Sequence, residues 1–335
     1  MDPRTRARSL LIGLCAALVM TSMASRAALA LDTQRPDVQE FMAMMEQQDS
    51  FSAPRLRELL QSATTQPAIL QAMDRPAEKA KLWYEYRPIF LNEKRLAEGV
   101  AFWTAHRAEL QQASLQTGVP AEYLVAIIGV ETSFGRLTGH FRVIDALSTL
   151  AFDYPPRAKF FQSELEQFLL LTREADIDPL AATGSYAGAM GAPQFMPSNY
   201  RRYAIDADHD GRIDLWTDWP DVFASIGNYF REHGWNPGDP VLTEAELAPD
   251  SAMTLDGRSL NLNETVGTLR ARGIRFDTAL PINARALLIA ADEPDGVHWR
   301  VGYENFYVIT RYNHSALYAM AVYELATALK SRTSF

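Results

Sequence analysis

The chain is almost free of cysteine. Cys15 is the only one among 335 residues, and it lies in an N-terminal stretch that we expect to be removed, which excludes a disulfide framework in the mature chain. Long runs of lysine or arginine are also absent, and the formal net charge is −9. Loss of residues 1–30 would remove four of the 32 basic and one of the 41 acidic residues, which leaves −12. Nucleic acid and anionic membrane surfaces are therefore poor partners.

The sequence also lacks the short motifs of several large enzyme classes. It contains no Gly-x-Ser-x-Gly nucleophile elbow, no phosphate loop, no dinucleotide fingerprint and no His-Glu-x-x-His zinc motif. Its six histidines are scattered, and a lone residue such as His314 is more often a structural group than a ligand. No internal repeat is evident. We therefore expect no organic cofactor.

The N-terminus has the composition of a secretory signal. A start with several arginines is followed by an apolar run over residues 10–20 and by a small-x-small cleavage site at 28–30. The apolar run is too short for a membrane span. Leu14 precedes Cys15 where lipidation needs a small residue, so an outer-membrane lipoprotein is disfavoured. We predict a signal peptide over 1–30 and a periplasmic location.

Apolar spacing divides the rest of the chain into helical stretches and one short mixed stretch. The composition, 47% hydrophobic and 22% charged, suits a protein with a sizeable core. Period-3.6 patterns predict helices over 54–60, 97–115, 157–173, 222–233 and 318–329. Turn signals and β-rich segments predict strands over 286–291 and 299–303. A mainly helical protein with a small β insertion follows.

One glutamate stands inside the most apolar of these stretches. Leu124, Ile127 and Ile128 form an i, i+3, i+4 stripe, and the i+7 position on the same stripe is Glu131. Apolar surroundings would raise the pKa of this carboxyl group, so that it could hold a proton and act as a general acid. The alternative is a structural glutamate at the edge of the core, paired with Arg136 or Arg142.

A run of small residues follows over 184–198, Gly-Ser-Tyr-Ala-Gly-Ala-Met-Gly-Ala-Pro-Gln-Phe-Met-Pro-Ser. Small residues let the backbone approach a ligand or another backbone closely. Met190, Phe195 and Met196 would anchor the segment, and Pro197 suits the start of a helix. These features favour an ordered segment that approaches a ligand, with a flexible loop as the alternative.

An acidic stretch matches most of a calcium loop. The matching positions are Asp206, Asp208, Asp210, Gly211, Arg212 (through its carbonyl) and Asp214. The final position is Thr217 rather than glutamate, so Asp218 or Asp221 would have to complete the ligand shell. Crowded carboxylates repel one another without a cation, which favours structural Ca²⁺ over a metal-free acidic turn.

Several motifs, in this order, resemble the family of membrane-bound lytic murein transglycosylase B. They are residues 128–136 around Glu131, 184–198, the calcium loop, and 310–315 (Thr-Arg-Tyr-Asn-His-Ser). The resemblance implies a mainly α (α+β) fold with a lysozyme-like core, an EF-hand-like calcium loop, an N-terminal α-domain and a small β-subdomain. The expected parts are an α-domain over 31–116 with part of 140–180, a core over 117–237 with the calcium loop at 206–221, a β-subdomain over 238–301, and a return to the core over 302–335.

This family cleaves the β-1,4 bond between N-acetylmuramic acid and N-acetylglucosamine in peptidoglycan and leaves 1,6-anhydromuramic acid ends. The resemblance implies that Glu131 is the sole catalytic acid and base. It implies substrate-binding roles for Ser185, Gln194, Tyr86, Tyr229, Tyr312, Asn313 and Tyr318. It implies calcium ligation by Asp206, Asp208, Asp210, the Arg212 carbonyl and Asp221.

Two rival functions stay open on sequence alone. A hydrolytic muramidase needs a second carboxylate, for which Asp145 and Asp153 are the nearest candidates. A non-catalytic murein-binding protein would keep the aromatic residues and be indifferent to Glu131. For either enzyme the expected partners are peptidoglycan glycan strands and proteins of cell-wall synthesis or the divisome, and we expect a monomer.

Overall fold

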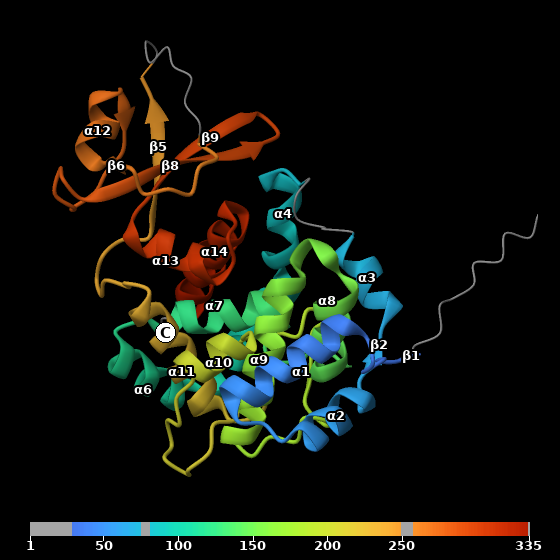
Figure 1. Ribbon diagram of the computed structural model, residues 1–335. Coiled ribbons are helices and arrows are strands. Elements are labelled where there is room, and N and C mark those ends of the chain that lie inside the picture. Colours follow the sequence, from blue (N-terminus) through green and yellow to red (C-terminus); the bar gives the residue numbers. More distant parts are fainter. Residues whose placement is uncertain (1–28, 75–80, 249–256, 334–335) are drawn as a thin grey trace, which may run out of the picture.

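A computed structural model describes residues 29–74, 81–248 and 257–333, and shows a helical body with a small β-subdomain at one end (Figure 1). Residues 1–28 of the predicted signal peptide lie outside the described residues. Leu29–Ala30 forms strand β1, which pairs with β2 (Thr64–Thr65). The mainly α fold with a small β-subdomain is confirmed.

Helix α7 (Ala121–Thr132) lies at the centre of the body. Eight of its twelve residues are buried and the other four are half-buried, because its sequence is apolar on almost every side. It packs on the helices α5 (Glu93–Ala105), α6 (Arg107–Thr117), α11 (Trp219–Glu232) and α14 (Ala316–Thr333). The structure therefore places Glu131 near the end of a rigid central element.

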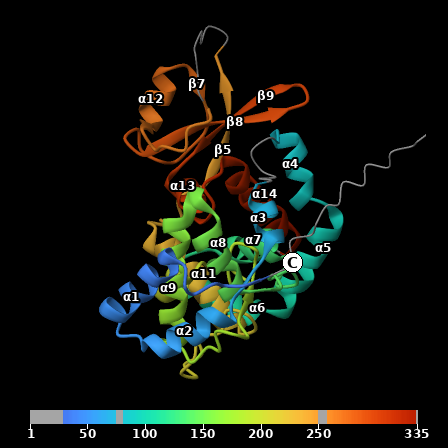
Figure 2. The ribbon, with the colours of Figure 1, turned by 45° about the vertical axis from the view of Figure 1, so that its right-hand side comes forward.

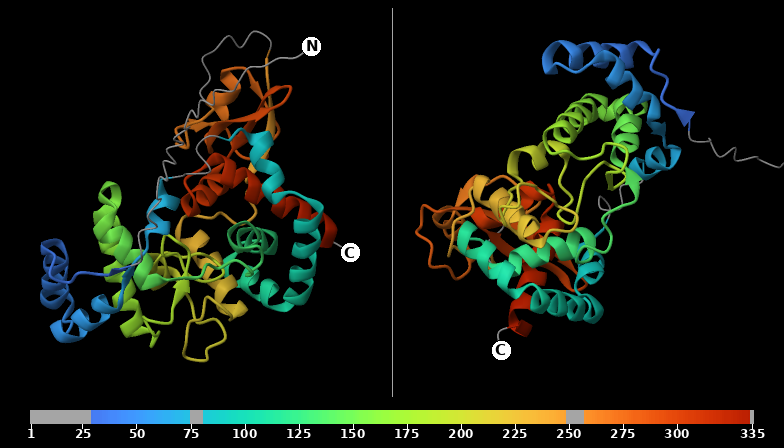
Figure 3. Two further views of the ribbon diagram at one scale, coloured as in Figure 1. Left: turned by 90° about the vertical axis from the view of Figure 1, so that its right-hand side faces the viewer. Right: turned by 90° about the horizontal axis from the view of Figure 1, so that it is seen from below.

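The predicted α-domain over 31–116 divides its packing between two neighbourhoods. Helices α1 (Pro36–Asp49), α2 (Ala53–Ser62) and α3 (Pro67–Met73) lie with α8 (Val143–Asp153) and α9 (Ala158–Glu174), which a short 3₁₀ turn at Pro155–Arg157 joins. By contrast, α4 (Trp83–Phe90), α5 and α6 pack on α14, α7 and α11. Figure 3 shows α1 and α2 on the far side of α8 and α9 from the central helix.

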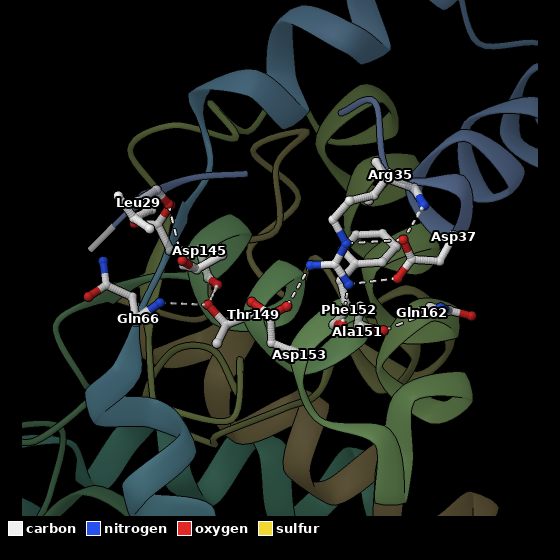
Figure 4. A network of polar contacts seen from close by, with 12 residues as sticks. Leu29, Arg35, Asp37, Gln66, Asp145, Thr149, Ala151, Phe152, Asp153 and Gln162 are labelled. Atoms are coloured by element: carbon white, nitrogen blue, oxygen red, sulfur yellow. Dashed lines mark hydrogen bonds and ion pairs between the residues drawn. The ribbon is translucent and has the colours of Figure 1, made fainter. Parts of the chain in front are cut away.

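Polar contacts attach the N-terminal helices to α8 (Figure 4). The Arg35 guanidinium, just before α1, forms ion pairs with Asp37 at 2.7 Å and with Asp153 at 2.6 Å. The backbone N–H of Gln66 donates to Thr149 Oγ1 at 3.0 Å. Residues 31–73 and 140–174 therefore form one neighbourhood, because these contacts and a shared apolar core join them.

One predicted helix is broken. The stretch 97–115 is interrupted at His106, whose backbone (φ −115°, ψ 27°) leaves the helical region between α5 and α6. The imidazole ring packs against Phe102, Trp219 and Phe223, with ring centroids 4.7, 5.1 and 6.0 Å away. Contact with α11 therefore outweighs the helical composition of this stretch.

The β-subdomain is a five-stranded antiparallel sheet in the order β6-β8-β9-β5-β7. A two-residue loop at Pro294-Asp295 joins β8 to β9, where the pair Glu293 and Gly296 closes the hairpin. The two strands predicted over 286–291 and 299–303 are thus confirmed as β8 and β9. The elements are β5 (Leu242–Leu247), β6 (Glu264–Thr265), α12 (Val266–Ala271), β7 (Ile274–Arg275), β8 (Arg285–Glu293) and β9 (Gly296–Gly302). Figure 2 shows α4 and α14 beneath this sheet.

The remaining elements are β3 (Phe141–Arg142), β4 (Thr183–Gly184), α10 (Pro197–Tyr203) and α13 (Glu304–Tyr312). Among the described residues, none of the helices has by itself both the length and the apolar content to span a bilayer. Helices α6 and α7 meet these criteria only as a pair, and there is a 113° bend between them.

Candidate active site around Glu131

The end of α7 carries Glu131 into an unusual backbone turn. The helix stops at Thr132, and Ser133 (φ 52°) and Phe134 (φ 63°) both adopt the left-handed conformation. Each such non-glycine residue costs of order 1–3 kcal/mol, so the surroundings must hold it. Phe134 is 7% exposed, and its ring lies against Phe102 with centroids 5.6 Å apart. The strained turn is thus fixed by packing directly after Glu131.

Thr132 connects this turn to the glycine-rich segment. Its buried hydroxyl shares its proton between the carbonyls of Ile128 at 3.2 Å and Ala192 at 3.0 Å, and accepts from Gly135 N at 3.0 Å. Ala192 lies in the run of small residues at 184–198. The catalytic candidate and the glycine-rich segment, 60 residues apart in sequence, are therefore adjacent.

The glycine-rich segment is an ordered strap, and the flexible-loop alternative does not hold. Ser185 N donates to Ala189 O at 2.8 Å, and Ser185 Oγ accepts from Ala189 N at 3.1 Å. Strand β4 pairs with β3 at its start. The strap lies so close to the preceding turn that a Cβ on Gly139 (φ +96°) would stand 2.0 Å from Gly184 O. Close backbone approach thus explains the small residues.

Gln194, at the other end of the strap, points back to the turn after α7. Its side-chain amide donates to Thr138 O at 3.1 Å and to Gly191 O at 2.9 Å, with the backbone at φ 53°. The half-buried amide oxygen of Gln194 is the part of the group that remains for a ligand. Ser185 and Gln194 therefore both lie against the turn that follows α7 and Glu131.

Three of the predicted tyrosines line this site from helices α11, α13 and α14. The Tyr318 hydroxyl donates to Glu131 Oε1 at 2.6 Å. The Tyr312 hydroxyl donates to Pro193 O at 2.7 Å, and the Tyr229 hydroxyl donates to Arg311 O at 2.7 Å. Burial, followed by the nearby Glu131 carboxylate, raises the pKa of both Tyr312 and Tyr318 well above the ordinary phenol value. Both phenols therefore remain protonated donors.

The remaining substrate-binding candidates differ in exposure. Tyr86, Tyr229 and Tyr318 are each 4% exposed or less, so their rings support the site rather than form an open stacking surface. Asn313 is half-buried at the end of α13. Tyr186, between Ser185 and Gln194, is 44% exposed and was not singled out from the sequence. Its place directly after Ser185 was the only available signal, and it is the aromatic of the strap that a sugar could reach.

The carboxylates and arginines of the alternative interpretations are engaged elsewhere. Asp145, 4% exposed, forms a two-bond ion pair with Arg142 at 2.7 and 2.9 Å and accepts from Thr64 N at 2.8 Å. Asp153 pairs with Arg35 at 2.6 Å, and Figure 4 shows both aspartates on α8 facing the N-terminal helices. Arg136 pairs with Glu98. These residues therefore supply neither a second catalytic carboxylate nor a structural partner for Glu131.

The acidic loop gathers three carboxylates. Ligand oxygens of Asp206, Asp208 and Asp210 lie within 4.8 Å of one another. Asp206 Oδ1 is buried and has no hydrogen-bond partner in the described part of the chain, which is the environment of an atom that a cation would satisfy. Burial raises the pKa of Asp218, and repulsion from Asp208 and Asp210 adds to this rise. The donor set fits a hard divalent cation.

Asp221, the other expected ligand, is held in place by backbone hydrogen bonds. Asp221, 1% exposed, accepts from Ala207 N at 2.7 Å and from Asp214 N at 2.9 Å, one bond to each carboxylate oxygen. It thus joins the two ends of the acidic loop by backbone bonds. Gly211 N donates to Asp206 Oδ2 at 3.0 Å, which closes the turn that presents the Arg212 carbonyl.

The acidic loop is bonded to the strap. Ala192 N donates to Leu215 O at 2.7 Å, and Trp216 Nε1 donates to Thr183 O at 2.9 Å. A cleft of about 960 Å³ lies on the outer side of this contact, between the loop and the end of α9. The acidic loop is therefore hydrogen-bonded to the chain on both sides of Ser185.

Comparison with known proteins identifies relatives of this chain. The family model described as "Transglycosylase SLT domain" matches residues 33–327. Membrane-bound lytic murein transglycosylase B of Escherichia coli is 40% identical over 303 residues, 88% of this chain and 82% of that protein. A crystal structure of soluble lytic transglycosylase SltB1 from Pseudomonas aeruginosa is 49% identical, with a TM-score of 0.85 over 90% of this chain and 100% of that one. The E. coli lytic transglycosylase Slt35 in complex with calcium is 39% identical, with a TM-score of 0.83 over 92% of this chain and 97% of that one. The chain described here belongs to the lytic transglycosylases of the SLT-domain family.

Proposed function

We propose that this enzyme cleaves the β-1,4 bond between N-acetylmuramic acid and N-acetylglucosamine in peptidoglycan and forms 1,6-anhydromuramic acid. The observation that carries the proposal is the Glu131 carboxyl group, held by Tyr318 at 2.6 Å and placed beside the strap of Ser185 and Gln194. The nearest alternative carboxylates, Asp145 and Asp153, are in ion pairs with arginines. A mechanism with one carboxylate therefore suits the site better than one with two.

The reaction needs two proton transfers through the same group. Glu131 first gives its proton to the glycosidic oxygen, and the C1–O bond breaks while the substrate's own N-acetyl carbonyl supports the positive charge at C1. Glu131, now a carboxylate, then takes the proton of the C6 hydroxyl, whose oxygen bonds to C1 and closes the anhydro ring. The glutamate ends protonated as it began, and no water is consumed.

The hydrolytic alternative differs from this reaction by one water molecule. Mass spectrometry of the muropeptides released from purified peptidoglycan tests the proposal directly. We expect products that lack one water relative to reducing-end N-acetylmuramic acid. Reducing-end products would indicate a hydrolytic muramidase, and the absence of any soluble product would indicate a binding protein.

The other site residues are proposed to bind and orient the sugars. Ser185 and Asn313 are the polar groups available to hold the acetamido group or the glutamate, and Gln194 offers its amide oxygen. Tyr312 and Tyr229 pack together, with ring centroids 4.9 Å apart, and support Pro193 on the strap. Tyr318 bonds Glu131 on the buried side of the site, and Tyr86 is buried near Tyr318.

Loss of the Tyr318 hydroxyl tests the orientation of the acid. In Tyr318→Phe we expect kcat to fall by about 10- to 100-fold, the value of a hydrogen bond to a charged group. KM should change little, because the hydroxyl bonds Glu131 rather than the sugar. Tyr323→Phe, on the same helix, is the matched control and should retain full turnover. Equal activity of both variants would mean that Tyr318 does not orient Glu131.

We propose that the acidic loop binds structural Ca²⁺ through Asp206, Asp208, Asp210 and the Arg212 carbonyl, with Asp221 bracing the loop. Slt35, the E. coli relative, has been crystallised with calcium. The ion would neutralise the crowded carboxylates, and the bonds of Leu215 and Trp216 to the strap would extend its effect to Ser185.

Calcium removal should therefore lower thermal stability. A ligand present at 100 times its Kd stabilises a fold by about 2.7 kcal/mol, which for a chain of this size corresponds to a Tm decrease of roughly 5 °C on chelation. Calcium added back should restore the Tm, and Asp208→Asn should show a smaller response. A melting curve indifferent to both chelator and calcium would make this segment a metal-free turn.

The remaining proposals concern place and partners. We propose a periplasmic enzyme, exported by the signal peptide over 1–30, that acts on glycan strands as a monomer. Proteins of cell-wall synthesis or division are the expected macromolecular partners.

A further inference from the structure

A buried arginine of the β-subdomain reaches into the catalytic body. Arg300, on β9, is 7% exposed. Its Nη2 lies 2.9 Å from Glu324 Oε1 on α14, and its Nε lies 3.1 Å from Glu244 Oε1 on the neighbouring strand β5. A cation this deeply buried is retained only with close counter-charges, so the sheet and α14 are held in one geometry at this point.

The same carboxylate also holds helix α4. The second oxygen of Glu324 accepts a hydrogen bond from Arg87 Nε. The Arg300 guanidinium lies over the ring of Trp83, 5.5 Å from the centroid. Trp83 and Arg87 are four residues apart and so share one face of α4. Arg300 thus contacts this face twice, once through the aromatic ring and once through the shared carboxylate.

Helix α4 carries Tyr86 next to this face. The helix spans only Trp83–Phe90 and contains Pro88, so it has little stability of its own and depends on tertiary contacts. The Tyr86 ring lies 6.5 Å from that of Trp83 and is 2% exposed. Through Arg87 and Glu324, α4 packs on α14, which also carries Tyr318, the donor to Glu131.

We infer that Arg300 is a positioning residue for catalysis: together with Glu324 and Arg87 it fixes α4, and thereby Tyr86, beside the Tyr318–Glu131 pair. The inference rests on the proposed function, since it concerns the same glutamate. It gives the β-subdomain a catalytic role in addition to any role in binding. An error of about 1 Å in the position of a group in the active site can cost as much as 100-fold in rate, so a support of this kind is measurable.

The test compares Arg300→Met with a matched variant, Arg285→Met. Arg285 also joins the sheet to the body, through Glu304 on α13 at 2.6 Å, but by a different helix from α4. We expect R300M to lower kcat on purified peptidoglycan by about tenfold with KM changed less than twofold. R285M should leave kcat unchanged. Both variants are assayed well below their measured Tm, so that loss of folded protein does not contribute.

A double-mutant cycle with Tyr86→Phe separates positioning from simple support of the fold. If Arg300 acts through Tyr86, the kcat effects of R300M and Y86F are not additive, and R300M costs much less in the Y86F background. If R300M does not fold, Arg87→Met replaces it in the same cycle. The Arg87 side chain is 49% exposed, so its replacement disturbs the core less than that of the buried Arg300. Unchanged kcat in R300M and R87M, or additive effects with Y86F, would overturn the positioning role.

Glu131→Gln is measured in the same series. An inactive E131Q beside a fully active R300M overturns the inference about Arg300 and leaves the proposed function standing. An active E131Q overturns the proposed role of Glu131, and hydrolytic products from the unchanged enzyme overturn the proposed reaction.

Discussion

Glu131→Gln should abolish release of soluble muropeptides from purified peptidoglycan. The amide can neither give a proton to the glycosidic oxygen nor take one from the C6 hydroxyl, so both transfers are lost. General acid–base catalysis contributes about 10²–10⁴-fold per group, and we expect a loss of about 10³-fold or more in kcat. Tyr318 can still donate to the amide oxygen of glutamine, so the fold and the Tm should be nearly unchanged.

The control for this variant lies on the same helix. Glu122 is 9% exposed and pairs with Lys330 at 2.8 Å, so Glu122→Gln removes a carboxylate from α7 away from the strap. E122Q should keep its turnover while losing some stability. Substantial activity in E131Q would remove the proposed acid, and equal losses in both variants would point to damage to α7 rather than to lost chemistry.

Gly139→Ala should be the most damaging conservative change near the site. The new methyl group would stand 2.0 Å from Gly184 O and 2.5 Å from Ser185 N, both backbone atoms. The positive φ of +96° adds strain of about 1–2 kcal/mol for any side chain, and the forced displacement costs about 1–3 kcal/mol more. Because Ser185 must move, we expect kcat/KM to fall about 100-fold as well.

Gly234→Ala separates the two causes. Gly234 has nearly the same backbone angle (φ +92°), but apart from its two neighbours in the chain no described residue has an atom within 4 Å of where its Cβ would be. This variant should show only the strain, as a Tm lower by a few degrees with full activity. If G139A behaved like G234A in both Tm and turnover, the strap would not need its close contact with the turn after α7.

Local patterns were sufficient for much of the fold. Helices α9, α11 and α14 lie where apolar spacing predicted them, because that spacing is a local property of the sequence. The hairpin at Pro294-Asp295 follows from its turn residues. The break at His106 could not be predicted in the same way, since a ring contact with Trp219, more than 100 residues away, causes it.

The candidate site also has features that local patterns predicted and features that they did not. Glu131 was identified because a carboxylate interrupts an apolar stripe, and the acidic loop because its spacing is local. The donor from Tyr318, 187 residues away, and the link from Thr132 to Ala192 were not visible in any pattern. The resemblance to the transglycosylase family predicted that Tyr318 is a site residue. Only the structure shows that its hydroxyl bonds Glu131.

By itself, the sequence determined which segments are helical, which carboxylate stands in apolar surroundings and which acids are close enough to share a cation. Each of these depends on residues a few positions apart, whose relative geometry the backbone fixes. Tertiary structure alone decided that Asp145 and Asp153 are bound in ion pairs, that Thr132 meets the strap, and that Arg300 reaches α4 through Glu324. These contacts join residues far apart in the chain, and which of them form depends on the packing of the whole core.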